Sequence, residues 1–417
     1  MGFINQSSVF LSVMFLTACA STVVTAPADT RLPASTSAAL CENDVAEIRA
    51  DHPTARLNQC DVLSENAFAF TIRPEAKTDP QGAPINNSAW YGFRVDPKTN
   101  DDIRISLKYE NGKHRYKPKK SYDGKNWTVI SERQLTKRAD DHLDLRLKSD
   151  GRPFYVSAQE IFTAKAHDNW TAQMAERPFV SASVIGTSLK GYPLQMLDAQ
   201  TEPNKAKPYV VLVGRQHPPE ITGALALMPF TETVLGETDL AKRFREHFNV
   251  LIVPMINPDG VSAGHWRFSE GGMDLNRDWG PFSQPETRAV KDAFSRFKTT
   301  AGTGGADRVA FFLDFHSTAR NLLYTQADDE PTSPPFFARD WVAAVDARLD
   351  DDVYAFTREA RHNSGRPISK NYMYDTYGIS SITYEVGDET NRDAIDLSAI
   401  VFAQEMMSLL LTHETGE

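Results

Sequence analysis

The sequence predicts an α/β protein in which an N-terminal antiparallel β-sandwich is followed by an α/β domain with a mixed, largely parallel sheet. From about residue 60 to 157, short runs of alternating apolar and polar residues follow one another without a helical pattern between them. Such alternation is typical of antiparallel strands that bury one face. From about residue 180, near-continuous apolar runs such as 210–213 and 311–313 alternate with amphipathic helical stretches. This second pattern indicates strands that are buried on both faces of a helix-covered sheet.

The β-sandwich is expected over residues 43–160. Its strands are predicted around residues 68–72, 90–95, 103–107 and 143–147. Asn111-Gly112 and Asp123-Gly124 lie between such runs and are signals for hairpin turns. The region shows no cluster of metal-ligand residues in its sequence, so we expect a structural or substrate-gating role rather than a chemical one.

The α/β domain is expected over residues 161–417. Strands are predicted at 183–185, 194–197, 209–213, 250–253, 309–315 and 381–384, and helices at 160–176, 221–235, 285–298, 336–348 and 397–412. After the strand at 250–253, the residues Asn257-Pro258-Asp259-Gly260 predict a tight turn that leads into a long loop.

Length and composition bound the class of protein. The chain has 417 residues, of which 41% are hydrophobic, so it has room for two or three domains with cores of their own. Its net charge of −10 argues against a nucleic-acid partner, because a protein that binds nucleic acid needs a basic surface.

The N-terminus predicts export and attachment to a membrane. The apolar run 9–16 is too short to span a bilayer but has the length of a signal-peptide core. It leads into Leu16-Thr17-Ala18-Cys19, which resembles the bacterial lipobox, where the signal is cut before a cysteine that is then acylated. We therefore expect a signal peptide at 1–18, a lipid-anchored flexible tether at 19–42, and a periplasmic or outer-membrane lipoprotein of a bacterium. An ordinary secretory signal with an incidental cysteine is the alternative.

Two further cysteines, Cys41 and Cys60, form an even pair in a chain that is expected to be exported. A disulfide bond between them is plausible in an oxidising compartment, and two free buried thiols are the alternative. Neither cysteine has metal-ligand spacing.

Polar residues with catalytic potential follow three of the predicted strands. His217 and Glu220 follow the strand at 209–213, and His316 and Glu385 lie at the ends of two later strands. The carboxyl ends of parallel strands share one sheet edge, where α/β proteins bind ligands, so these side chains are expected to meet. Two imidazoles and one carboxylate suit a catalytic Zn²⁺ with its fourth position open.

These residues and their neighbours together form a set of motifs that resembles a known protein family. The pieces that carry this resemblance are Ile185-Gly186-Thr187-Ser188 with Gly191, Arg215-Gln216-His217-Pro218-Pro219-Glu220, Asn257-Pro258-Asp259-Gly260-Val261, Arg267, Asp274-Leu275-Asn276-Arg277, His316-Ser317 and Thr383-Tyr384-Glu385. In this order, over residues 180–390, they resemble the zinc metallocarboxypeptidase family of carboxypeptidase A, and most closely its cytosolic carboxypeptidase branch. Members of that branch carry a β-sandwich before the catalytic domain.

The resemblance implies a metal site. His217, Glu220 and His316 would bind one zinc ion per chain, with Asp274 holding His217 in the ligating tautomer. Zinc would bring the pKa of its bound water near 7, which makes the water a nucleophile at neutral pH.

The resemblance also implies roles around the metal. Glu385 would act as general base, and Arg267 would stabilise the oxyanion. Asn276 and Arg277 would clamp the C-terminal carboxylate of the substrate. Counting back from Glu385 by the family's spacing reaches Lys370, which would select an acidic C-terminal residue. A one-residue gap would place Asn371 there instead, and Arg366 of the same loop is a further candidate cation. The family's mobile tyrosine has no counterpart at the expected distance.

The sequence thus predicts a zinc metallocarboxypeptidase that hydrolyses the C-terminal peptide bond of peptides with a free C-terminal carboxylate. Murein peptides would be a natural subset of its substrates in the cell envelope. Two alternatives remain, a zinc amidohydrolase or deacylase of the aspartoacylase-like kind, and a non-catalytic lipoprotein that binds peptides.

Overall fold

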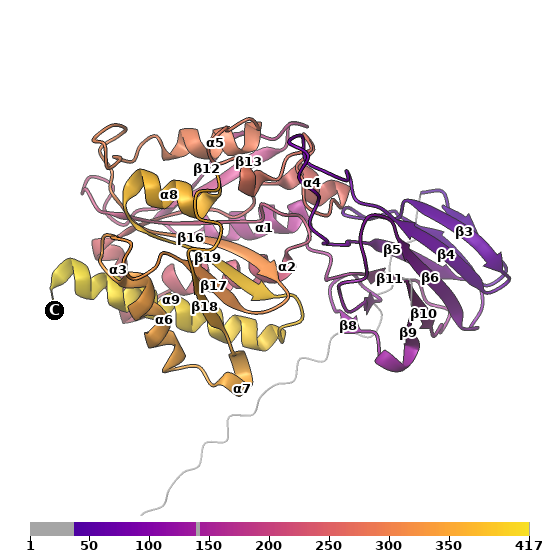
Figure 1. Cartoon of the computed structure of the whole chain (residues 1–417). Helices are drawn as coiled ribbons and strands as arrows, with labels where there is room; N and C mark the ends of the chain where they lie inside the picture. The colour runs from indigo at the N-terminus through magenta and orange to yellow at the C-terminus, as the bar shows by residue number, and fades with distance from the viewer. Residues whose placement is uncertain (1–36, 139–141, 417) are drawn as a thin grey trace, which may run out of the picture.

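The computed structural model describes residues 37–138 and 142–416. The predicted signal peptide, Cys19 and most of the predicted tether lie outside the described residues. Within them the chain forms two regions that lie side by side, an N-terminal β-region and a larger α/β region (Figure 1).

The β-region consists of two sheets that share one core. One sheet has the strand order β1-β2-β5-β11-β7-β8, and the other has the order β3-β4-β6-β10-β9. The strands are β1 Cys41–Glu42, β2 Ala46–Arg49, β3 Gln59–Ser64, β4 Ala67–Ile72, β5 Gly92–Pro97, β6 Ile103–Tyr109, β7 Lys119–Ser121, β8 Thr128–Val129, β9 Leu135–Lys137, β10 Leu143–Leu147 and β11 Phe154–Ser157, with the short 3₁₀ helix η1 Glu132–Gln134 before β9. Side chains such as Phe93 of β5 and Ile105 of β6 meet in the common core.

One strand pair departs from the antiparallel pattern that we expected. Strands β4 and β6 pair in parallel, while the other strand pairs of the two sheets are antiparallel. Between β4 and β6 the chain crosses to the other sheet and runs through β5, so it returns in its original direction. The structure also forms the disulfide bond between Cys41 and Cys60, with their Cα atoms 5.9 Å apart, which joins β1 of one sheet to β3 of the other.

The α/β region is built on an eight-stranded sheet with the order β12-β13-β15-β14-β16-β19-β17-β18. These strands are β12 Val180–Thr187, β13 Pro193–Ala199, β14 Tyr209–Gly214, β15 Asn249–Val253, β16 Val309–Thr318, β17 Leu322–Thr325, β18 Thr357–Ala360 and β19 Ser380–Gly387. The central strands β15, β14, β16 and β19 are parallel. The pairs β12–β13, β13–β15 and β17–β19 are antiparallel, and the edge strand β18 runs parallel to β17. The sheet is therefore mixed, with a parallel centre.

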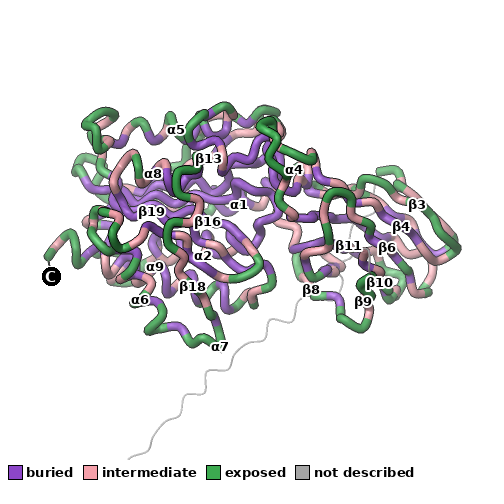
Figure 2. The backbone as a smooth tube through the Cα atoms, viewed as in Figure 1, coloured by how far each residue is buried: buried purple, intermediate pink, exposed green. Residues whose placement is uncertain are grey.

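Helices cover both faces of this sheet. They are α1 Ala164–Met174, α2 Ile221–Val234, α3 Asp239–His247, α4 Pro258–Ala263, the 3₁₀ helix η2 Leu275–Arg277, α5 Pro285–Phe294, α6 Phe337–Asp346, α7 Asp351–Tyr354, α8 Ser369–Tyr377 and α9 Arg392–Thr415. Val210 and Leu212 of β14 face a core with α2, α3, α6 and α9, while Val211 and Val213 face a second core with α5 and α8. This division explains why β14 is apolar at consecutive positions, and Figure 2 shows the central strands as buried.

Helix α9 is long and apolar enough to cross a bilayer by length and composition. It instead packs against α2, α3 and α6, and 61% of its most apolar stretch is buried. Its hydrophobicity is thus that of a core helix.

The segment after β15 differs from the predicted turn. Pro258 begins α4, and the Asn257 side chain caps this helix by accepting a hydrogen bond from the Gly260 amide at 3.0 Å. The prediction of a simple turn was therefore wrong, because Asn followed by Pro is also the start signal of a helix.

Candidate active site

The site begins where β14 ends. Arg215 has a φ of 53°, which is uncommon for a residue other than glycine, and the chain turns sharply there toward the helix α2. The Arg215 guanidinium is buried and donates two hydrogen bonds to the Pro218 carbonyl, at 3.0 and 2.8 Å. This contact braces the turn that carries His217 and Glu220.

A close approach of helix and strand brings the third member of the cluster near. A Cβ on Gly223, in the first turn of α2, would lie 2.5 Å from the backbone oxygen of His316 on β16. Only glycine therefore lets α2 lie against β16 at this point. As a result Glu220, at the start of α2, faces His316.

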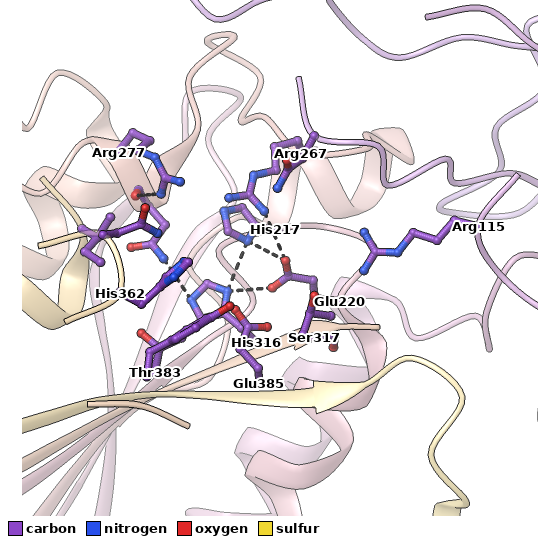
Figure 3. Close-up of a pocket in the computed structure, with 16 residues that line it drawn as sticks. Arg115, His217, Glu220, Arg267, Arg277, His316, Ser317, His362, Thr383 and Glu385 are labelled. Atoms are coloured by element: carbon purple, nitrogen blue, oxygen red, sulfur yellow. Dashed lines mark hydrogen bonds and ion pairs between the residues drawn. The ribbon is translucent and has the colours of Figure 1, made fainter. Parts of the chain in front are cut away.

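Three potential ligand atoms then converge (Figure 3). His217 Nδ1 lies 2.8 Å from Glu220 Oε1, and His316 Nδ1 lies 2.7 Å from Glu220 Oε2. The two Nδ1 atoms are 3.2 Å apart. These side chains are buried and form a group of His and Glu that can hold a metal ion.

Carboxylates orient the rings of both histidines. His217 Nε2 lies 2.9 Å from Asp274 Oδ1, and His316 Nε2 lies 2.9 Å from Asp314 Oδ2. Because a carboxylate only accepts, each Nε2–H donates to its outer carboxylate, and this contact turns each Nδ1 toward Glu220. A cation that replaces the protons on the two Nδ1 atoms would meet two nitrogens and one carboxylate oxygen, a set that suits zinc.

Opposite charges within the cluster stabilise one another. Burial lowers the pKa of His316, but the Asp314 and Glu220 carboxylates outweigh burial and raise this pKa well above its usual value. Burial raises the pKa of Glu220, but the two imidazoles outweigh burial and hold its pKa well below the usual range. The carboxyl group is thus ionised. Asp314 was not singled out from the sequence, although residues two apart in a strand share a face, so its place two before His316 was an available signal.

Glu385 lies in the same cavity as this cluster. It is paired with His316 in the register of β19 against β16, and it lines a cavity of about 130 Å³. Its Oε2 is buried and has no hydrogen-bond partner among the described residues. Burial, with the charge of Glu220, raises the pKa of Glu385 to about 7, which suits a group that exchanges protons near neutral pH.

The two arginines predicted from the sequence lie on this cavity as well. Arg267 Nε donates to Asp274 Oδ2 at 2.9 Å, and its Nη1 lies 3.4 Å from Glu220 Oε1. Among the described residues, the Arg277 guanidinium donates one hydrogen bond, at 2.7 Å to the backbone oxygen of Asn276. Its other N–H groups are therefore available to a ligand in the cavity.

Asn276 also lines the cavity, but its side chain has partners inside the protein. Its Oδ1 accepts a hydrogen bond from the Ser369 amide at 3.0 Å. Its Nδ2 lies 3.3 Å from His316 Nε2, whose proton is donated to Asp314, so these two nitrogens are neighbours without a hydrogen bond. Asn276 thus holds the start of α8 beside the metal-ligand cluster.

Lys370 does not reach this site. It is 2% exposed near the start of α8 and is not among the residues that line the cavity. Burial lowers its pKa, and the charges that oppose this effect are those of Glu330 and Asp375. The prediction that Lys370 reads the substrate is therefore not supported by its position, because the spacing rule ignored how the loop before α8 folds.

That loop places another residue in the cavity. His362 stacks on Tyr324 with ring centroids 3.8 Å apart, and both rings line the cavity. Arg361 and Asn363, on either side of His362, have φ values of 57° and 56°. The backbone is thus in an uncommon conformation that presents His362, a role for which the sequence carries no periodic signal.

The β-region contributes a cation that the sequence analysis missed. Arg115 lines the cavity on the side opposite Arg277 (Figure 3). Its Nε donates to Asp388 Oδ2 at 2.9 Å, just after β19. No sequence signal joins a loop of the β-region to a strand end more than 270 residues later.

Comparison with known proteins identifies the family of this chain. A family model described as zinc carboxypeptidase, peptidase M14, matches residues 167–407, which include the metal-ligand cluster, both arginines and Glu385. The chain belongs to the zinc carboxypeptidase family. The resemblance seen in the sequence is thus confirmed.

Relatives of known name include cytosolic carboxypeptidases. Cytosolic carboxypeptidase 6 of Mus musculus is 27% identical over 212 residues, which is 42% of this chain and 38% of that protein. Cytosolic carboxypeptidase 2 of Danio rerio is 31% identical over 144 residues, which is 32% of this chain and 20% of that protein. The chain therefore spans well under half the length of these two relatives.

The chain shares its fold with metallocarboxypeptidases whose structures have been solved. A metallo-carboxypeptidase from Burkholderia cenocepacia superposes with a TM-score of 0.71 at 19% identity, covering 89% of this chain and 100% of that one. A metallo-carboxypeptidase from Pseudomonas aeruginosa, in complex with (2-guanidinoethylmercapto)succinic acid, has a TM-score of 0.68 at 19% identity, with 87% and 98% covered. Both matches extend beyond the α/β region into the β-region.

Proposed function

We propose that this protein is a zinc-dependent carboxypeptidase that hydrolyses the C-terminal peptide bond of peptides with a free C-terminal carboxylate. The observation that carries the proposal is the convergence of His217 Nδ1, His316 Nδ1 and the Glu220 carboxylate in one cavity with a carboxyl group and arginines. Two imidazoles and one carboxylate are a ligand set that suits catalytic zinc, and the surrounding groups are those that peptide hydrolysis uses.

The cluster would hold one zinc ion through His217, Glu220 and His316, while Asp274 and Asp314 keep the two imidazoles oriented. When bound, zinc supplies a Lewis acid and lowers the pKa of water at its open position to near 7. Loss of either outer carboxylate weakens metal binding by roughly 10–100-fold in comparable sites.

The protein's own groups carry the proton and the developing charge. Glu385, whose pKa burial raises to about 7, takes a proton from the attacking water and passes it to the leaving amine. The Arg267 guanidinium faces the cluster, where it stabilises negative charge on the former carbonyl oxygen. One preorganised donor of this kind lowers the barrier by about 3–4 kcal/mol in comparable enzymes.

Specificity for a chain end comes from Arg277. Its guanidinium has donors available on the cavity and can bind a carboxylate with two parallel hydrogen bonds. Asn276 lies beside it and holds the neighbouring backbone. A substrate carboxylate bound there would place the last peptide bond at the metal-ligand cluster, so single C-terminal residues would leave.

The test uses paired peptides that differ only in having a C-terminal acid or a C-terminal amide. Zinc-loaded protein should release single residues from the acids, as read by mass spectrometry, and should leave the amides nearly intact. Arg277→Ala should raise KM for the acids and reduce the difference in cleavage rate between the acid and the amide of each pair. Cleavage inside the peptides, or no cleavage of either, would contradict the proposal.

The presence of Arg267 and Arg277 in one cavity favours a peptidase over an aspartoacylase-like deacylase, since a peptide offers both a developing oxyanion and a chain-end carboxylate. The same assay decides between them when N-acyl amino acids are added as a third substrate class. A protein that binds the acids without cleaving them would be a peptide-binding lipoprotein instead.

We also propose that the protein is an envelope lipoprotein held by acyl chains on Cys19, supported by the lipobox-like Leu16-Thr17-Ala18-Cys19 after an apolar run. Cys19→Ser should block processing or move the protein from the membrane fraction to the soluble fraction. Wild-type protein found only in the soluble periplasmic fraction would contradict lipidation.

A further inference from the structure

The segment that carries Arg267 is built into the β-region. Trp266, the preceding residue, is fully buried and belongs to the core that the two sheets of the β-region share. Its indole Nε1 donates to the backbone oxygen of Trp90 at 3.1 Å. A Cβ on Gly112 would lie 2.5 Å from the Trp266 ring, so the loop after β6 packs directly on this indole.

A single carboxylate from the β-region holds the backbone of the same segment. Glu75 accepts hydrogen bonds from three consecutive amides, those of Trp266 at 2.7 Å, Arg267 at 2.8 Å and Phe268 at 2.7 Å. Hydrogen bonds to a charged acceptor are about twice as strong as neutral ones. The α/β region thus does not fix this backbone alone.

The loop that carries Glu75 is itself tied to both regions. Arg56 donates through Nε and Nη2 to the backbone oxygen of Arg73, at 3.1 and 2.9 Å, and through Nη1 to that of Ala263 at 3.5 Å. The positive charge of Arg56 also acts on Glu75. Arg56 therefore keeps Glu75 next to the end of α4, just before Trp266.

The other end of Arg267 is held by the α/β region. Its Nε donates to Asp274, and its Nη1 donates to Glu220, so the guanidinium is directed at the metal-ligand cluster. Its backbone is fixed by one region and its charged group by the other. Arg267 is consequently placed by the contact between the two regions.

We infer that Glu75 is a positioning residue for catalysis, through which the β-region holds Arg267 where negative charge develops on the substrate. This inference rests on the proposed carboxypeptidase function. An oxyanion donor is effective only when it is preorganised, and a misplacement of about 1 Å can cost roughly 100-fold in rate. The β-region is then part of the catalytic machinery although it holds none of the metal ligands.

The test is Glu75→Gln in the full-length, zinc-loaded protein. Glutamine has the same shape, but its amide nitrogen cannot accept, so at least one of the three N–H groups loses its partner. We expect kcat to fall roughly tenfold with KM and zinc content unchanged. Affinity for a phosphonate transition-state analogue should fall by the same factor, while affinity for a released product should stay the same. Glu65→Gln, an exposed glutamate of the same region, is the matched control.

A double-mutant cycle separates positioning from general stability. In an Arg267→Gln background, Glu75→Gln should cost less than about twofold, because the group through which it acts is gone. An equal loss in both backgrounds, or a loss of zinc or a higher KM in place of lower kcat, would overturn the inference. If the wild type is active and Glu75→Gln is equally active, the inference fails while the proposed function stands. If the wild type has no peptidase activity, the proposed function itself fails.

A second variant keeps the test decisive if Glu75→Gln does not fold. A Cβ on Gly112 would lie 2.5 Å from the Trp266 ring and 2.7 Å from Asn87 Oδ1, so Gly112→Ala displaces the segment through a contact that does not involve Glu75. Folded Gly112→Ala should show the same fall in kcat and in analogue affinity at constant KM. A normal kcat in that variant would overturn the inference.

Discussion

The two regions differ in how their strands place polar side chains. In the α/β region the central strands are parallel, so β14, β16 and β19 end at one edge, where His217, His316 and Glu385 meet. In the β-region nearly all strand pairs are antiparallel, so their carboxyl ends point both ways. Among the described residues, the cluster able to hold a metal lies in the α/β region. Parallel strands thus bring polar side chains together at one sheet edge, whereas the β-region contributes to the site through loops such as those that carry Glu75 and Arg115.

The largest effect is expected from a test of whether the α/β region alone supplies the metal ligands. His217→Ala should abolish both zinc binding and peptide hydrolysis, because two remaining ligands cannot complete a catalytic zinc site. Zinc content by mass spectrometry and release of C-terminal residues measure the two losses. His114→Ala, in the β-region, should keep stoichiometric zinc. Full zinc in a double variant that lacks both His217 and His316 would contradict the assignment.

The second effect concerns the base. Glu385→Gln should lower kcat by at least about 100-fold with zinc retained, since it keeps the shape and removes only the group that takes the proton. Steady-state kinetics with a peptide acid, alongside the zinc content, provide the measurement. Near-normal kcat in this variant would contradict the role of Glu385, and Glu65→Gln in the β-region should leave kcat unchanged.

A pair of core substitutions tests whether the regions unfold together. Phe93 in the β-region and Phe312 in the α/β region are both fully buried, and truncation of either to alanine should cost about 3–5 kcal/mol of unfolding free energy. Because Trp266 and Glu75 join the regions, each variant should shift one common transition in a denaturant titration. Two transitions, of which only one moves, would show that the regions unfold independently.

The smallest effect is confined to the β-region. Replacing Cys41 and Cys60 with serine removes a cross-link between residues 19 apart in sequence, which should lower the unfolding free energy by about 3 kcal/mol. Zinc content and kcat at a temperature where the protein is folded should not change. Wild-type protein unfolded under reducing conditions should match the variant, and a large loss of kcat in the folded variant would contradict a purely structural role.

By itself the sequence determined the elements whose residues carry a period. Alternating strands such as β6 and doubly buried strands such as β14 lie where they were predicted, because burial on one or two faces leaves a pattern in the chain. Polar residues at the ends of such strands, including His217 just after β14 and His316 near the end of β16, could be picked out because strand ends in a parallel sheet share an edge. The family resemblance then supplied the roles that spacing alone cannot.

The tertiary structure decided what depends on contacts between distant segments. Lys370 lies outside the cavity and His362 inside it because the loop from 361 to 366 folds through three residues of positive φ, which spacing along the chain does not reveal. Glu75 meets Arg267 across 192 positions of sequence. A loop's position follows from long-range hydrogen bonds and packing rather than from local periodicity. The contact between Glu75 and Arg267 could therefore be found only in the folded structure, where the two regions pack together.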